Sequence, residues 1–100
     1  MASILKDLRR KMSTVTATVT IEDPIGFHAR PAGQIVKLVK ESGLEIRMGK
    51  VGGNMVKANS PLGLMAMKGK TGEELTVEVD TEDAAQAQAI IDQIQQFLKG

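Results

Sequence analysis

The sequence predicts an α+β fold of two layers, an open-faced sandwich in which three helices cover a four-stranded antiparallel sheet. Four segments alternate apolar and polar residues, as strands with one buried and one solvated face do. Three other segments place apolar residues three or four positions apart, as helices with one buried face do. The order of these elements along the chain is βαββαβα.

The first strand is expected over residues 14–22, where polar residues, mostly threonine, alternate with an apolar side. That apolar side consists of Val15, Ala17, Val19 and Ile21. Asp23-Pro24 ends the strand, and a loop leads to Pro31. Proline lacks an N–H and disfavours helical geometry in the residue before it, so we expect a helix that begins at or beside Pro31. Ser42-Gly43 should end this helix.

A hairpin, a short helix, a fourth strand and a last helix follow. They are expected at residues 44–58, 60–67, 75–80 and 84–98. Ser60-Pro61 pairs a good N-cap with a proline at the first helical position of the short helix. Thr81-Glu82-Asp83 places negative charge at the positive end of the last helix.

The composition excludes several kinds of protein. The 100 residues include no cysteine, one histidine and two aromatic side chains, and the net charge is +1. Without cysteine there is no disulfide scaffold, thiolate zinc site, iron–sulfur cluster or thiol nucleophile. So few aromatic residues argue against base stacking on nucleic acid. No segment is apolar enough for a membrane span or a secretory signal. We expect a cytoplasmic protein, and we also expect it to be a monomer with no metal and no cofactor.

Residues 1–12 are expected to be a flexible extension ahead of a single domain over residues 13–100. The extension carries an apolar stripe surrounded by basic residues, a pattern also found in helices that bind a membrane or a partner. Because about 12 residues are marginal for an isolated helix, a frayed tail is the favoured interpretation.

The single histidine, His28, lies at the mouth of the first helix, two residues before Arg30. The first N–H groups of a helix are unpaired, and together with the helix dipole they form a site for anions. Arg30 adds a planar cation suited to phosphate or carboxylate. Since the positive helix end disfavours a protonated ring, we expect His28 to be a neutral nucleophile for a phosphoryl group. The alternative is a solvated loop residue without this role.

The stretch Gly26-Phe27-His28-Ala29-Arg30-Pro31-Ala32, between a threonine-rich strand and an amphipathic helix, resembles the active-centre signature of the HPr family. These proteins are the histidine-containing phosphocarriers of the phosphoenolpyruvate-dependent sugar phosphotransferase system. Residues 59–65 resemble the second motif of the family, and residues 69–74 resemble the turn before its last strand. The resemblance covers about residues 13–100, and the βαββαβα order is that of the family.

The resemblance implies that His28 accepts a phosphoryl group on its Nδ1 (pros) nitrogen from phosphorylated enzyme I. His28 would then pass this group to enzyme IIA domains. Arg30 would stabilise the phosphoryl charge, helped by the backbone N–H groups of Ala29 and Arg30. Such a protein is a stoichiometric carrier rather than a turnover enzyme, and it needs an exposed histidine rather than an enclosing pocket.

Five residues match positions at which the family presents an apolar docking surface to its partners: Phe27, Ala32, Gly33, Leu62 and Met65. For Leu62 and Met65, burial in the core is an equally weighted alternative. The resemblance also makes Ser60 a candidate for phosphorylation by a regulatory serine kinase, with a phosphorylase to reverse it. Because Pro61 stands where the family commonly has a bulky aliphatic residue, we favour a role for Ser60 as a helix cap alone.

Two other functions stay open on the sequence. One is a regulatory paralogue of the same fold that acts by protein binding, and the intact His28 counts against it. The other is a small-molecule-sensing α+β domain.

The glycine pattern at residues 49–52 matches that of a nucleic-acid-binding GXXG loop, but a hairpin turn explains it better because it lies between two strands.

The net charge of +1 hides two segments of opposite sign. Residues 26–72 hold eight basic and two acidic side chains, whereas residues 73–100 hold one basic and seven acidic. If the fold keeps these segments apart, a positive field would surround His28 and speed encounters with acidic partners.

Overall fold

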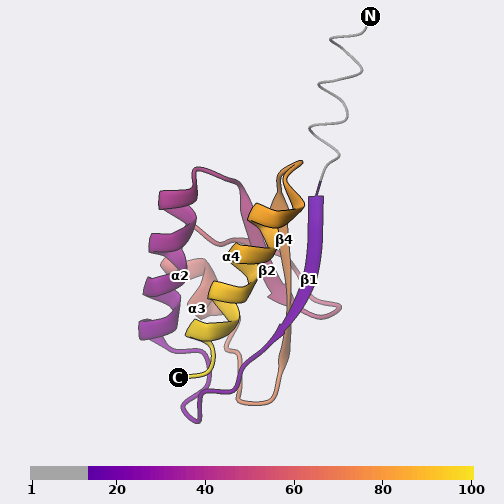
Figure 1. Ribbon diagram of the computed structural model, residues 1–100. Helices are drawn as coiled ribbons and strands as arrows, with labels where there is room; N and C mark the ends of the chain where they lie inside the picture. Colours follow the sequence, from indigo (N-terminus) through magenta and orange to yellow (C-terminus); the bar gives the residue numbers. More distant parts are fainter. Residues whose placement is uncertain (1–13) are drawn as a thin grey trace, which may run out of the picture.

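The computed structural model describes residues 14–100 and confirms the two-layer α+β fold (Figure 1). The strands are β1 (Thr14–Thr20), β2 (Ile46–Lys50), β3 (Val56–Lys57) and β4 (Glu74–Asp80). The helices are α2 (Ala29–Ser42), α3 (Pro61–Ala66) and α4 (Ala84–Phe97), which gives the predicted order βαββαβα. The extension predicted for residues 1–12 lies outside the described residues. Within the described part, no helix is long and apolar enough to cross a membrane.

The four strands form one antiparallel sheet in the order β1-β4-β2-β3. β4 lies between the first two strands, with Thr14 of β1 opposite Asp80 and Ile46 of β2 opposite Val79. Only β2 and β3 pair as neighbours in sequence. The three helices lie on one side of the sheet (Figure 1), so one sheet face is covered and the other is open.

The covered face of the sheet carries the hydrophobic core, as the alternating patterns predict. Six strand residues there are at most 2% exposed: Val19, Ile46, Met48, Leu75, Val77 and Val79. The helices contribute their apolar stripes to the same core, including Ile35, Val39, Leu64, Ile91 and Ile94. Burial of this side-chain layer, not local propensity, supplies most of the stability of helices this short.

The start of α2 differs from the prediction that the helix begins at or beside Pro31 and that Arg30 avoids helical geometry. The helix begins at Ala29, and Arg30 is helical. Pro31 therefore occupies the third helical position. Its missing N–H costs nothing there, because the first four N–H groups of a helix have no intrahelical partner.

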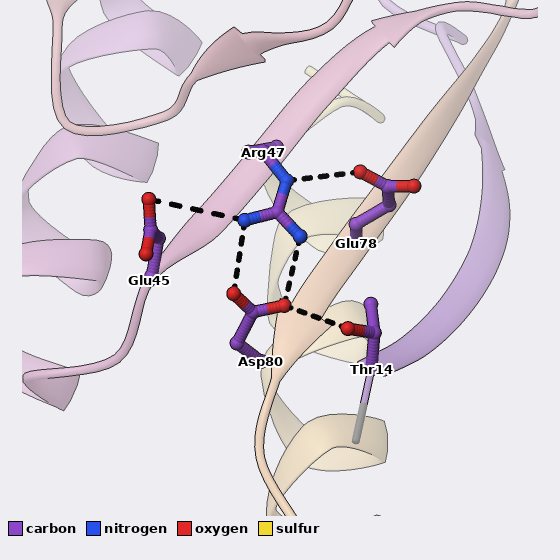
Figure 2. Close-up of polar contacts among 5 residues, drawn as sticks. All are labelled: Thr14, Glu45, Arg47, Glu78 and Asp80. Atoms are coloured by element: carbon purple, nitrogen blue, oxygen red, sulfur yellow. Dashed lines mark hydrogen bonds and ion pairs between the residues drawn. The ribbon is translucent and has the colours of Figure 1, made fainter. Parts of the chain in front are cut away.

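A cluster of polar side chains on the open sheet face joins β2 to β4 (Figure 2). Arg47 of β2 donates from Nε to Glu78 at 3.0 Å and from its two terminal nitrogens to Asp80 at 2.9 and 2.8 Å. Thr14 of β1 donates to the same Asp80 at 2.9 Å. The hydrogen bonds from Arg47 hold the pKa of Asp80 below its ordinary value, and they raise the pKa of the guanidinium. Three strands are thereby tied at one end of the sheet.

The fold does not keep the two charged segments fully apart, which was the condition for a positive field around His28. Arg47 and Lys50 belong to the basic segment, yet both pair with the acidic one, Lys50 reaching Glu73 at 3.3 Å. β2 lies beside β4, so opposite charges meet where the segments touch. Arg30, two residues from His28 in sequence, has no ion-pair partner within residues 14–100. Any electric field that attracts acidic partner proteins therefore comes from the basic side chains that are not paired in this way.

Replacing Arg47 by Met should lower the free energy of unfolding by about 1–2 kcal/mol, because it removes the guanidinium that donates to two partly buried carboxylates. Urea titration measures this change. Lys57→Met is the matched control, since Lys57 lies opposite Arg47 on β3 and is exposed. An equal loss in both variants would assign the effect to net charge instead of to these hydrogen bonds.

The Arg47→Met difference should also depend on pH with a definite sign. The folded-state pKa of Asp80 lies below its ordinary value of 3.8. Its ionised form therefore contributes stability that is complete above about pH 4 and is lost as the pH falls through the folded-state pKa. The gap between wild type and Arg47→Met in unfolding free energy should narrow in that acidic range. A difference in unfolding free energy that stays constant over this pH range would contradict the stabilising role of ionised Asp80.

Candidate functional site

His28 lies at the start of α2 as the N-cap residue, with extended backbone angles (φ −121°, ψ −172°). Its side chain is 28% exposed, so the ring is reachable from solvent while one edge rests on the protein. No side chain caps this helix, whereas Ser60 caps α3 and Asp83 caps α4. The N–H groups of the first turn of α2 are therefore available to an anion beside the ring.

Asp23, which the sequence assigned only to ending the first strand, is the partner of His28. Its Oδ2 lies 2.9 Å from Nε2 of the ring, and its Oδ1 accepts a hydrogen bond from the N–H of Ile25 at 2.8 Å. The side chain of Asp23 is 8% exposed. The hydrogen bond from Ile25 and then that from His28 lower the pKa of Asp23, against the opposing effect of burial. Asp23 is thus an ionised acceptor next to the ring at neutral pH.

The loop from Asp23 to His28 is fastened to parts of the chain far away in sequence. The backbone N–H of Asp23 donates to the Leu98 carbonyl at 2.8 Å, and the Asp23 carbonyl accepts from the hydroxyl of Thr71 at 2.6 Å. The N–H of Phe27 donates to the Gly69 carbonyl at 3.0 Å. The start of α2, the end of α4 and the turn before β4 meet at one end of the molecule (Figure 1).

Gly26 is the one position in this loop that needs glycine. Its φ is +89°, a conformation that residues with side chains rarely adopt. A Cβ at Gly26 would also lie 2.9 Å from the carbonyl oxygen of Gly69. The close approach lets the Gly69 carbonyl accept the N–H of Phe27, the residue before His28.

Arg30 lies in the first turn of α2 with an exposed side chain. It borders a small pocket of about 110 Å³ that is also lined by Asp23, Gln34 and the end of α4. The guanidinium and the free N–H groups of the first turn lie on the same helix end as His28. This set of donors can hold a phosphoryl group and neutralise part of its charge.

The five predicted docking residues fall into two groups. Leu62 and Met65 are 83% and 42% exposed, so the alternative that they are core residues is wrong, and Gly33 is also exposed. For Phe27 and Ala32 the docking prediction is wrong, because they are only 7% and 1% exposed and pack into the core.

Phe27 is buried because the turn at Gly26 directs it inward, and Ala32 is buried because it lies on the inner stripe of α2. Ile25, which was not among the predicted docking residues, is 76% exposed in the loop before His28. An apolar side chain next to a turn is the sequence feature that could have indicated Ile25 as a docking residue.

Ser60 caps α3, as predicted. Its Oγ accepts a hydrogen bond from the N–H of Gly63 at 3.1 Å, and Pro61 occupies the first helical position. Phosphorylation of Ser60 by a serine kinase stays untested, and we favour the role as a helix cap alone.

Replacing Ser60 by Ala should lower the free energy of unfolding by about 1 kcal/mol, whereas Ser60→Asp should retain most of the stability because aspartate also caps helices. Chemical denaturation of both variants checks this, and equal losses would argue against capping.

Comparisons with known proteins show which family the chain belongs to. The family model for the PTS HPr component phosphorylation site matches residues 15–99. The phosphocarrier protein HPr of Lysinibacillus sphaericus is 38% identical over 74 residues, covering 72% of this chain and 81% of the relative. The phosphocarrier protein NPr of Klebsiella oxytoca is 28% identical over 78 residues, covering 78% and 87%.

A solved structure gives the same result. The histidine-containing phosphocarrier protein of a Mycoplasma superposes with a TM-score of 0.72 at 31% identity, covering 84% of this chain and 97% of that one. A family match over nearly all of the described residues, together with a histidine at an uncapped helix start, identifies the chain. It belongs to the HPr family of phosphocarrier proteins of the phosphotransferase system.

Proposed function

We propose that this protein carries a phosphoryl group on His28, accepting it from phosphorylated enzyme I and passing it to enzyme IIA domains. The observation that supports this most is the position of the ring. His28 lies at the only helix start, among the three described, that no side chain caps. Arg30 follows in the first turn with a guanidinium that is free of ion pairs within residues 14–100. Negative charge brought to this place meets donors that are already oriented.

The transfer is a displacement at phosphorus. The Nδ1 lone pair of neutral His28 forms the new N–P bond, while the N–P bond of the donor phosphohistidine breaks and its electron pair returns to the donor ring. The proton on Nε2 of His28 stays in place beside Asp23. The positive charge of the phosphorylated ring thus passes from donor to acceptor, and no free proton is needed. Arg30 and the N–H groups of Ala29 and Arg30 stabilise the charge on the phosphoryl oxygens during the passage.

Partner proteins are expected to dock on the exposed apolar residues around the histidine. Leu62 and Met65 present their side chains from α3, which packs beside α2, and Ile25 lies in the loop that precedes His28. Exposed apolar groups of this kind mark interaction sites. The flexible side chain of Met65 suits a surface that must fit first a donor and then different acceptors.

The proposal is tested by incubating the full chain with enzyme I, Mg²⁺ and ³²P-labelled phosphoenolpyruvate. We expect one phosphoryl group per chain, labile in acid and stable in alkali, on the peptide that contains His28. The label should pass to an added enzyme IIA domain. A chain that stays unlabelled, while an HPr of known activity is labelled in the same mixture, would overturn the proposal and favour a regulatory paralogue that acts by binding.

A further inference from the structure

We propose that Asp23 is a positioning residue, which holds the proton of the neutral His28 ring on Nε2 and so presents Nδ1 as the nucleophile. This inference rests on the proposed function for its catalytic consequence. Its structural part, the choice of tautomer, holds or fails independently of any phosphoryl transfer.

The tautomer follows from which groups can donate. A neutral imidazole carries one proton, on either Nδ1 or Nε2. Nε2 lies 2.9 Å from Oδ2 of Asp23, and an ionised carboxylate can only accept hydrogen bonds. Nε2 must therefore be the donor, which leaves the lone pair on Nδ1. Among residues 14–100 no group forms a hydrogen bond with Nδ1.

Asp23 is well held for this task. Its Oδ1 is occupied by the N–H of Ile25, so the carboxylate cannot turn both oxygens toward the ring. Its backbone is fixed by Leu98 on one side and Thr71 on the other. The hydrogen bond from His28 and the positive charge of Arg30 both favour the ionised form of the carboxylate. The acceptor thus has a fixed place, a fixed orientation and a fixed charge.

The same contact has a second consequence once the phosphoryl group has arrived. With Nδ1 phosphorylated and Nε2 protonated, the ring is a cation, and its N–H still faces the Asp23 carboxylate. The pairing of a cation with a carboxylate is stronger than that of a neutral ring. Asp23 therefore stabilises the phosphorylated form, in addition to orienting the ring before transfer.

Replacing Asp23 by Asn gives a prediction that a merely structural role would not give. The N–H of Ile25 needs an acceptor, so it should keep the amide oxygen at the Oδ1 position and leave the NH₂ group facing His28. An NH₂ group donates, which forces Nε2 to accept and moves the ring proton to Nδ1. The most conservative substitution should then be the most harmful one. Asp23→Ala removes the acceptor for Nε2 without putting a donor in its place, so it should give a mixture of tautomers, although it also removes the acceptor of the Ile25 N–H.

The tautomer can be read directly, because His28 is the only histidine in the chain. Long-range ¹H–¹⁵N spectra of the unphosphorylated protein, recorded at a pH where the ring is neutral, distinguish the two ring nitrogens. We expect Nε2–H in the wild type, mainly Nδ1–H in Asp23→Asn and a mixture in Asp23→Ala. Glu22→Gln is the control, since it removes the neighbouring exposed carboxylate and should leave the spectrum unchanged. A wild-type ring protonated on Nδ1, or unchanged tautomers in both Asp23 variants, would overturn the inference.

The rate of phosphoryl transfer from enzyme I supplies the second measurement. Enforcing the wrong histidine tautomer by a carboxylate-to-amide change can cost up to about 10⁴-fold in rate. We expect Asp23→Asn to be slowed by at least about 100-fold and Asp23→Ala by less. If Asp23→Ala is slower than Asp23→Asn although both fold, Asp23 is only a structural anchor. If the wild type shows Nε2–H but is never phosphorylated, the proposed function fails while the tautomer assignment stands.

Discussion

In the His28→Ala variant, we expect no acid-labile phosphoryl group under conditions that label every wild-type molecule. The variant has no other imidazole, because the chain contains a single histidine, and it has no cysteine that could act as a substitute nucleophile. The loss should be complete, rather than a fractional change in rate. Quenched-flow labelling with enzyme I and labelled phosphoenolpyruvate measures it. Label that survives in His28→Ala would place the phosphoryl group elsewhere.

A second variant separates loss of the nucleophile from damage to the loop. Removing the ring leaves the carboxylate of Asp23 without one of its hydrogen-bond donors, which costs stability as well as function. In His28→Gln the side-chain amide can still donate to Asp23, yet it offers no nitrogen that can be phosphorylated. We expect this variant to be nearer the wild type in unfolding free energy and equally inactive in transfer.

Replacing Arg30 by Ala should slow phosphoryl transfer by about 100- to 1,000-fold, which is the usual cost of removing one preorganised donor from a developing negative charge. Arg30 is exposed and lies at a helix end, so its loss should change the free energy of unfolding by no more than about 0.5 kcal/mol. The combination of a large kinetic effect with an unchanged unfolding curve is the expected signature. Rapid-quench measurement of transfer from enzyme I, beside urea titration, tests both parts.

The controls for Arg30 distinguish local chemistry from general charge. Arg30→Lys keeps the charge but loses the planar pair of donors, so it should recover only part of the rate. Lys37→Ala removes an exposed cation farther along the same helix and should have little effect on transfer at physiological salt. Equal losses in Arg30→Ala and Lys37→Ala would attribute the effect to long-range attraction between the proteins.

The fold could be predicted because its patterns are local and strong. Alternation in the strands and the caps at Ser60 and Asp83 each depend on a few neighbouring residues, and both caps lie where expected. The strand bounds differ, because β1 ends at Thr20 and β2 runs over Ile46–Lys50, into residues expected in the hairpin turn. The start of α2 was misplaced because the preference of residues before proline is weak. Tertiary fixation of the loop outweighs it at Arg30. The contacts of Arg47 could not be predicted, because they depend on which residue of β4 lies opposite it.

Less of the candidate site could be predicted, because only part of it lies within one local motif. His28 and Arg30 lie in one short motif, so their proximity needs no knowledge of the fold. Asp23 contacts the ring only because the turn at Gly26 brings the loop back, and the exposure of Ile25 and burial of Phe27 follow from the same turn. The direction of a side chain in a loop is fixed by contacts with distant segments, here residues 69–71 and 98, which local patterns do not contain.

The fastening of the histidine loop also sets when the protein can begin to act during its synthesis. β1 leaves the ribosome first among the strands, but its only neighbour in the sheet is β4, whose partner for Thr14 is Asp80. The N–H groups of Glu22 and Asp23 wait still longer, for the carbonyl of Leu98. Long-range pairing of this kind forms late in folding. A nascent chain should therefore expose His28 early. The loop that holds the ring against Asp23 cannot be fixed until nearly all of the described residues have emerged.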